Sequence, residues 1–264
     1  MIRYVKTRYS SKFGYYEADE VIGKSLELYG EYSQFEVDFL LQLLTPESVV
    51  YDIGGNIGYQ ATAFASRAKR VYSFEPNAHN YYLLMNNTYE MSNIHTMNCA
   101  VGATNGVIKC VDYNPTIPGN FGSVQVGVES ATVPVPLVTI DSLELEKPKL
   151  IKIDVEGSEY AVLSGAIKTI TEHKPVLFYE AHETKQFREI YKLLKSLGYK
   201  LYWAQVNNYN PNNFAGNLIN VFGNTALFSI IGVPLEFPDI QLDKVSGPND
   251  SFEKLISRVR ARTK

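Results

Sequence analysis

The chain has 264 residues with a formal net charge of −3, and 45% of them are hydrophobic, a composition typical of one globular domain with a sizeable core. The slightly acidic balance argues against a nucleic-acid-binding protein, and no run reaches the roughly 18 apolar residues of a membrane-spanning helix. Met1–Ser10 lacks the apolar stretch of a secretory leader, and Cys99 and Cys110 are too few for a disulfide framework, so we expect a cytoplasmic protein.

Short apolar runs alternate with helical patterns from residue 48 onward. Strands separated by helices, with apolar residues along their whole length, imply a parallel sheet that is covered on both faces. The predicted strands are Ser48–Ile53, Arg70–Phe74, Ile94–Ala100, Leu150–Val155, Val176–Tyr179, Tyr199–Ala204 and Thr225–Ile231. The predicted helices are Tyr59–Arg67, His79–Met91, a segment after Ser158, and Lys185–Leu197, with Gly198 as its stop.

Three further segments flank or interrupt this core. Residues 1–47 form an N-terminal helical cap, in which Ser33 and Glu36 have the spacing of a capping box that opens a helix over Phe35–Leu44. An insertion at 102–137 contains three strand-like pieces, Val107–Val111, Val124–Val128 and Thr132–Val138, and we expect a small antiparallel flap. Residues 48–231 are thus the core, and residues 232–264 are a C-terminal extension that ends in a basic helix.

A glycine loop follows the first core strand, in the sequence Asp52-Ile53-Gly54-Gly55-Asn56-Ile57-Gly58. Glycines at such a strand-to-helix turn let the backbone approach a ligand, and the helix beyond them presents free N–H groups. Asn56 stands where a dinucleotide-binding loop has its second glycine. A carboxylate at Asp52 suits the ammonium of a methionine moiety better than a pyrophosphate, so an NAD-dependent dehydrogenase is disfavoured. A turn that needs its glycines only for packing is the alternative.

An acidic residue ends the second core strand. Glu75 lies 21 residues after Gly54 (75 − 54), the separation at which a carboxylate binds ribose hydroxyls in nucleotide-binding α/β folds. This interpretation holds for any nucleoside ligand and therefore predicts adenosine-like chemistry rather than a particular reaction.

Carboxylates also follow the strand Leu150–Val155. Asp154 is expected to point into the crevice at the carboxyl end of the sheet, and Glu156 to lie in the turn just beyond it. Two carboxylates could share a divalent cation through their oxygens, but two ligands are too few to predict a metal, and we assign none.

At these residues the chain resembles the FkbM-type methyltransferases. The resemblance rests on four segments, VVYDIGGNIGY, SFEPN, LIKIDVEGSEYAVLSGA and LFYEAH, and extends over residues 19–229. It implies the class I methyltransferase fold, a Rossmann-like α/β fold with a mostly parallel sheet, helices on both faces and an antiparallel C-terminal strand. It also implies S-adenosylmethionine as the cofactor and a hydroxyl group on a sugar or small-molecule natural product as the acceptor.

The resemblance further implies roles for individual residues. The methionine end of the cofactor would lie against Asp52, Gly54, Asn56 and Gly58, the ribose against Glu75, and the adenine near Asn98. The segments 104–135 and 206–224 differ most from the family and are expected to shape the acceptor pocket.

Methylation of a hydroxyl requires a base, because the alcohol must lose its proton as the new bond forms. Glu180 and His182 lie at the end of the fifth strand and share one side of it if the strand continues. Glu156 is the competing base. The aromatic residues Tyr202, Trp203, Tyr209 and Phe214 suit a sugar-binding platform, but the first two are expected to belong to a strand and its core.

Two alternatives remain open at this point. One is a methyltransferase that acts on a macromolecule, although neither Asn114-Pro115 nor Asn210-Pro211 continues into the motif of amino-methylating enzymes. The other is a binding module that retains the cofactor pocket without turnover, which the presence of Glu180 and His182 disfavours.

Overall fold

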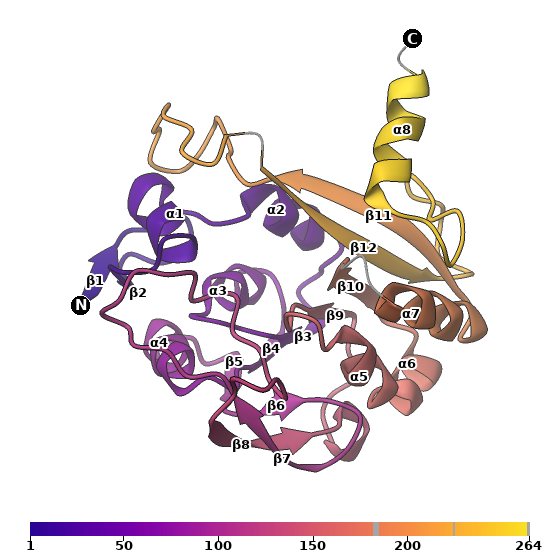
Figure 1. The fold of residues 1–264 in the computed structure, drawn as a ribbon, viewed down its shortest axis with the longest axis horizontal. Helices are drawn as coiled ribbons and strands as arrows, with labels where there is room; N and C mark the ends of the chain where they lie inside the picture. The colour runs from indigo at the N-terminus through magenta and orange to yellow at the C-terminus, as the bar shows by residue number, and fades with distance from the viewer. Residues whose placement is uncertain (182–184, 224, 263–264) are drawn as a thin grey trace.

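The computed structural model describes residues 1–181, 185–223 and 225–262, and its centre is a seven-stranded sheet (Figure 1). The spatial order of the strands is β11-β12-β10-β9-β3-β4-β5. All seven core strands predicted from the sequence are confirmed, as β3 (Val49–Ile53), β4 (Arg70–Phe74), β5 (Ile94–Met97), β9 (Leu150–Ile153), β10 (Val176–Glu180), β11 (Tyr199–Asn207) and β12 (Ala226–Pro234).

The sheet is mostly parallel, as predicted. Strands β5, β4, β3, β9 and β10 pair in parallel with their neighbours. The last strand, β12, inserts between β10 and β11 and runs antiparallel to both of them. The predicted antiparallel C-terminal strand is therefore confirmed. The parallel strands all end at one edge, where their carboxyl termini meet.

Helices cover both faces of the sheet because side chains alternate along each buried strand. On one face, Val50 and Leu150 pack against α2 (Gln34–Gln42), α3 (Tyr59–Ala65) and α4 (Ala78–Thr88). On the other face, Tyr51 and Ile151 pack in a second core with α5 (Glu159–Ser164), α6 (Ile167–His173) and α7 (Lys185–Ser196). The predicted helices are thus present, each within a few residues of its expected bounds.

The N-terminal segment contains more structure than the sequence suggested. It begins with a two-stranded antiparallel hairpin, β1 (Ile2–Val5) and β2 (Phe13–Tyr16), which is followed by α1 (Ile22–Tyr29). The predicted helix at residue 35 is present as α2, but the predicted capping box is wrong. Ser33 has a left-handed backbone (φ 48°) and makes no side-chain cap. Its expected partner Glu36 turns inward and is buried.

The insertion forms a small sheet of its own beside the core. Strands β6 (Ala100–Val101), β8 (Val133–Val138) and β7 (Gly106–Cys110) lie in that order. Only β7 and β8 form the expected antiparallel pair, because β6 runs parallel to β8. The third predicted piece, Val124–Val128, is not a strand and contributes a single bridge between Val126 and Cys110. The 3-10 helix η1 (Ile140–Ser142) then leads into β9.

A long loop joins β11 to β12 and lies over the N-terminal segment beside α1 (Figure 1). Beyond β12 the chain ends in α8 (Phe252–Arg262), which projects from the body of the molecule. Asp250 anchors the start of this helix by accepting hydrogen bonds from Trp203 Nε1 (3.1 Å) and from Arg258. No helix within the described ranges is both long and apolar enough to cross a bilayer.

Candidate functional site

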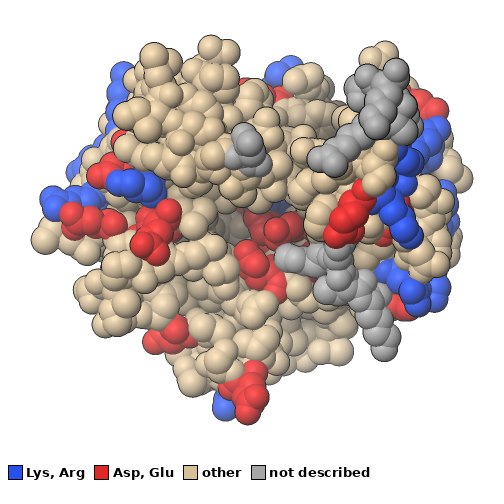
Figure 2. Space-filling view, turned by 45° about the horizontal axis from the view of Figure 1, so that its top comes forward, with Lys and Arg blue, Asp and Glu red and all other residues tan. Residues whose placement is uncertain are grey.

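A cavity of about 370 Å³ opens at the carboxyl edge of the parallel strands. Ligands bind at this edge in open α/β sheets, and the volume is typical of a small-molecule site. Acidic side chains gather around the hollow at the centre of the face in Figure 2. Its lining comes from the glycine loop, the ends of β4, β9 and β10, the N-terminal segment, the insertion, and both ends of the β11–β12 connection.

The glycine loop forms one wall of the cavity, and packing explains its composition. The backbone N–H groups of Gly54 and Gly55 donate to Phe74 O at 2.9 and 2.8 Å. A Cβ atom on Gly54 would lie 1.7 Å from Asp154 O, and one on Gly55 would lie 2.0 Å from Ser73 Oγ. Glycine is therefore required for the close approach of β3 to its neighbours. The same approach leaves the loop backbone lining the cavity.

Glu75 lies at the end of β4, lines the cavity and is only 5% exposed. Its carboxylate accepts hydrogen bonds from the backbone N–H groups of Asn56 (2.9 Å) and Asn77 (2.8 Å). Burial raises the pKa of Glu75 to about 7, against the opposing effect of these two donors. The residue is therefore held in one orientation, and it keeps its proton to a higher pH than an exposed glutamate does.

A row of polar side chains crosses the middle of the sheet under the cavity. Ser73, Asp52 and Lys152 are direct neighbours in the register of β4, β3 and β9. Ser73 Oγ donates to Asp52 Oδ2 at 2.9 Å, and Lys152 Nζ lies 3.4 Å from Asp52 Oδ1 and 3.3 Å from Asp154 Oδ2. Burial opposes the charge on Lys152, but Asp154, Asp52 and Glu36 outweigh it and raise its pKa. The ammonium group is thus fixed below the cavity.

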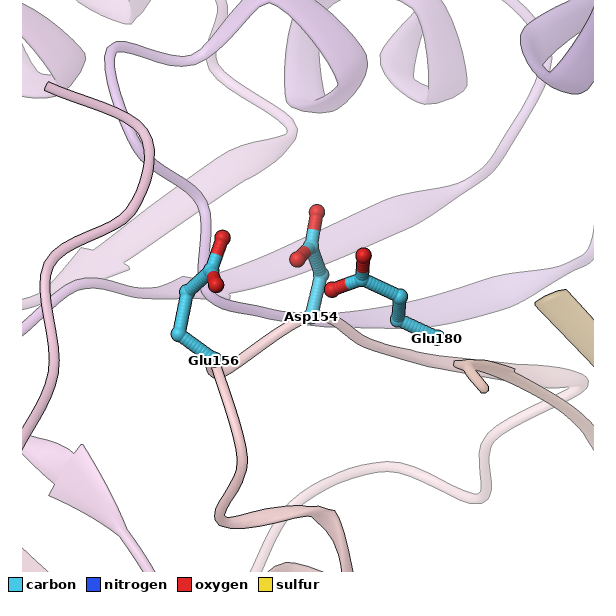
Figure 3. Close-up of side chains that lie close together, drawn as sticks. All are labelled: Asp154, Glu156 and Glu180. Carbon is cyan, nitrogen blue, oxygen red and sulfur yellow. The ribbon is translucent and has the colours of Figure 1, made fainter. Parts of the chain in front are cut away.

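Three carboxylates converge at the strand ends above this row. Asp154, Glu156 and Glu180 each offer an oxygen within 4.8 Å of the others, and Figure 3 shows them pointing into the same space. Within the described residues this is the group of side chains that could hold a divalent cation, since such ions prefer several oxygen ligands. The third member, Glu180, joins the pair that the sequence singled out because β9 and β10 are adjacent.

The N-terminal segment supplies another wall of the cavity, which includes Tyr32, Ser33 and Glu36. Glu36 is buried and accepts a hydrogen bond from Gln60 Nε2 on α3 at 2.8 Å. Burial raises its pKa to about 7. Helices α2 and α3 thus bring a buried carboxylate and its amide partner to the cavity.

The long loop between β11 and β12 is held over the N-terminal wall by a buried carboxylate. Glu31 Oε1 accepts from Asn210 Nδ2 (2.7 Å), and Glu31 Oε2 accepts from Phe214 N (2.9 Å) and Arg8 (2.8 Å). Tyr29 OH donates to Ile219 O at 2.8 Å. We call these contacts the Glu31 latch. They hold the loop whose first residues reach the cavity at Asn208.

Backbone strain is concentrated at the cavity. In the described part of the chain, four residues other than glycine have positive φ, and three of them, Ser33 (48°), Asn56 (48°) and Glu156 (52°), line the cavity. Such conformations cost about 1–3 kcal/mol each and persist where the surrounding structure enforces them, often at functional sites. This observation supports the cavity as the functional site independently of its charge.

The structure brings most of the sequence-predicted site residues together. Gly54, Asn56, Glu75, Asp154, Glu156 and Glu180 line the cavity. Asp52 and Gly58 lie behind the wall, since Asp52 is fully buried against Ser73 and Gly58 packs on Leu84. Asn98 braces the Glu75 turn by donating to the carbonyl groups of Glu75 (2.8 Å) and Pro76 (3.1 Å). His182 lies outside the described residues.

Both segments expected to shape the acceptor pocket contribute to the lining, the insertion through residues 120–126 and the long loop through Asn208. The aromatic residues do not form a platform there. Tyr202 and Trp203 are buried in the core, as expected for strand residues. Tyr209 packs on Tyr29, and Phe214 binds at the Glu31 latch.

The polar residues that line the cavity without having been predicted there include Lys152, Glu36 and Gln60. The sequence does carry a signal for Lys152, which is a charged residue within an otherwise apolar central strand and lies two positions from Asp154, on the same side. The sequence carries no such signal for Glu36. The spacing of Glu36 from Ser33 matches a helix cap, which predicts an exposed side chain rather than one that points into the cavity.

Comparison with known proteins identifies similar chains. The model of the methyltransferase FkbM domain matches residues 52–201. A hexuronic acid methyltransferase of Haloferax volcanii is 27% identical over 191 residues, which cover 70% of this chain and 76% of that protein. A solved FkbM methyltransferase of Methylobacillus flagellatus superposes with a TM-score of 0.50 at 20% identity, over 71% of this chain and 44% of that one. The present chain thus spans less than half of that solved chain, and this likeness bears on the fold alone.

Proposed function

The chain belongs to the FkbM methyltransferase family, and on that premise we propose that it uses S-adenosylmethionine to methylate a hydroxyl group of a sugar or another small molecule. The proposal rests on one observation: the carboxylates of Glu75 and Asp154 line the same cavity, at the ends of β4 and β9. A rigid carboxylate suits the two ribose hydroxyls, and a second carboxylate suits the positive charge at the methionine end.

The residues present fit this cofactor. The Glu75 carboxylate is oriented by two backbone donors and still faces the cavity, so it can accept hydrogen bonds from a ribose. Gly54 and Asn56 present loop backbone to the same space. Asp52 would act indirectly, by fixing Lys152 and through it Asp154. Asn98 would act indirectly as well, by holding the turn that carries Glu75.

When bound, the cofactor would supply an electrophilic methyl group on a positively charged sulfur. The chain's own contribution is then to exclude water, to orient an acceptor and to accept its proton. The cluster of Asp154, Glu156 and Glu180 provides negative charge beside the cofactor site. Glu180, Glu156 and His182 are the proton acceptors that the sequence suggests, and the first two line the cavity.

A sugar acceptor is supported by the Haloferax volcanii relative, which methylates a hexuronic acid. The cavity wall contributed by the N-terminal segment and by Asn208 is rich in hydrogen-bonding groups, as a polyhydroxyl acceptor requires. We therefore place the acceptor between this wall and the acidic cluster.

Calorimetric titration of the purified protein with S-adenosylmethionine and S-adenosylhomocysteine tests the cofactor. Micromolar binding, about −8 kcal/mol, is expected for the wild type, with loss of at least about 1.4 kcal/mol in Glu75→Ala. NAD serves as the control ligand and should not bind. Turnover is then measured by mass spectrometry with hexose and hexuronic acid glycosides. Binding without any methylated product would indicate a cofactor-binding module instead.

A further inference from the structure

Glu36 is a charged residue in an unusual place. It lies in the first turn of α2, where an acidic residue is normally exposed, yet only 5% of its surface is accessible and it lines the cavity. Its Oε1 accepts from Gln60 Nε2, a neutral donor that is itself 8% exposed. Among the described residues no cation lies within ion-pair distance of Glu36, and Lys152 acts on its charge from further away. A buried carboxylate without a cationic partner has a high affinity for a proton.

The charges around Glu36 come from two neighbouring strands, β9 and β10. Lys152 on β9 favours its ionised form, whereas Asp154 at the end of the same strand and Glu180 on β10 oppose it. Burial is the largest influence, and the resulting pKa of about 7 means that both protonation states are populated at neutral pH. A general base performs best when its pKa is close to the working pH.

Two polar atoms of the same region have no hydrogen-bond partner in the described part of the protein. They are Ser33 Oγ, in a residue that is only 2% exposed, and Asn208 Oδ1 on the facing loop. Both residues line the cavity together with Glu36. An unsatisfied buried polar atom costs about 1–3 kcal/mol, and a ligand that carries several hydroxyl groups would remove this cost.

We propose that Glu36 accepts the proton of the acceptor hydroxyl and that Ser33 and Asn208 bind neighbouring hydroxyls of the same acceptor. This acceptor subsite rests on the proposed function. The acceptor O–H bond breaks and its proton passes to the Glu36 carboxylate, while the oxygen forms a bond to the methyl carbon. The carbon–sulfur bond breaks at the same time, and its electron pair stays on the sulfur of S-adenosylhomocysteine.

Glu36 suits this role better than Glu156 and Glu180, two of the three bases suggested by the sequence. Glu156 and Glu180 share one small space with Asp154 at the strand ends (Figure 3), beside the position proposed for the cofactor. Glu36 belongs to a separate wall with Ser33, and its only hydrogen-bond donor among the described residues is neutral. A proton transferred to Glu36 is therefore not drawn away by a competing carboxylate in contact with it.

The test compares Glu36→Gln with the wild type. Glutamine keeps the size of the side chain and its contact with Gln60 but cannot take a proton. We expect kcat to fall about 100-fold or more, and the rise of kcat through pH 7 to disappear. The affinity for S-adenosylhomocysteine should stay within about twofold of the wild type, since no cofactor contact is removed. Ser33→Ala should raise the acceptor KM about fivefold, as the loss of one hydrogen bond does.

Two controls make the result specific. Glu172→Gln removes an exposed carboxylate of α6 and should behave as the wild type. Glu180→Gln makes the same chemical change within the cavity. It should lower kcat, but kcat should still rise as the pH increases through 7.

The assay uses the methyl glycosides of glucose and glucuronic acid. Product formation by the wild type reports on the proposed function, and the ratio of variant to wild type reports on Glu36. A Glu36→Gln enzyme with kcat and pH profile unchanged would overturn the proposal, as would loss of the pH 7 transition in Glu180→Gln alone.

Discussion

Lys152 shows how one residue connects the core to the cavity. A lysine in a central strand is costly unless carboxylates surround it, and here Asp52 and Asp154 lie within 3.4 Å of its Nζ. The carboxylates in turn depend on the lysine, because Asp52 is fully buried and its other side-chain donor is the Ser73 hydroxyl. Removal of the ammonium therefore leaves a buried charge without its counter-ion.

We expect Lys152→Met to lower the free energy of unfolding by about 3 kcal/mol at pH 8. The loss should be smaller at pH 5, where the isolated Asp52 carboxyl is more easily protonated. Urea unfolding at the two pH values measures both effects. Lys69→Met is the matched control, because it breaks an exposed pair with Glu146 and should change stability by less than about 1 kcal/mol. Equal losses in the two variants would contradict this account of Lys152.

Glu75 should make cofactor binding depend on pH. Ribose hydroxyls donate hydrogen bonds, so they bind the ionised carboxylate, whose share grows as the pH passes the raised pKa of about 7. We expect the dissociation constant of S-adenosylhomocysteine to fall about tenfold from pH 6 to pH 8. Calorimetry should show this dependence in the wild type and in Glu36→Gln but not in Glu75→Gln. A wild-type affinity that is constant over this range would exclude Glu75 as the ribose ligand.

The sequence predicts residues at strand ends better than residues on helices. Glu75, Asp154 and Glu180 line the cavity as expected, because the carboxyl edge of a parallel sheet is fixed once the strands are known. Glu36 was misassigned because two physical roles share one sequence pattern. An acidic residue three positions after a serine either caps a helix or turns into the core, and only the packing of α2 on α3 decides between them.

At the scale of elements, the Glu31 latch is the contact most easily tested. Three donors converge on one buried carboxylate, so Glu31→Gln would place an amide N–H against at least one of them and lose the ion pair with Arg8. We expect a loss of about 1–3 kcal/mol in stability and faster amide hydrogen exchange in residues 207–223. Glu17→Gln breaks an exposed Arg pair and should have little effect on either. Unchanged exchange in the loop would show that the latch does not hold it.

The elements themselves were predictable where the hydrophobic pattern was pronounced. Buried strands of the core read as continuous apolar runs, whereas β1 and β2 are four-residue strands whose pairing depends on distant contacts such as that of Gly14 with Asn87. The small sheet at the insertion also differs from the predicted flap, because β6, which lies just before residue 102, joins β8 in parallel. Its strand β6 is only two residues long and takes its direction from the core strand that precedes it.

At the scale of the whole molecule, Glu36 and Glu75 should make the protein less stable at alkaline pH. Both have a folded-state pKa of about 7, above the ordinary value of 4.5, so the folded state binds their protons more tightly than the unfolded state. Their contribution is complete below pH 4.5 and is lost as the pH rises through about 7, by up to roughly 3 kcal/mol per residue. Urea unfolding at pH 5 and 8 should show this decrease in the wild type and a much smaller one in Glu36→Gln/Glu75→Gln. Identical pH dependence in both proteins would contradict it.

The position of β12 between β10 and β11 sets an order for assembly during translation. The strand that pairs with β10 begins at Ala226 and is therefore synthesised after both β10 and β11. From Glu180 to Pro234 the ribosome adds 54 residues (234 − 180), which takes roughly 3 to 11 s at common elongation rates. Throughout this interval the edge of β10 opposite β9 has no strand beside it, and an unpaired edge invites pairing with another nascent chain. The yield of folded protein should therefore depend on how quickly this stretch is synthesised, and slow codons between residues 181 and 234 should favour aggregation.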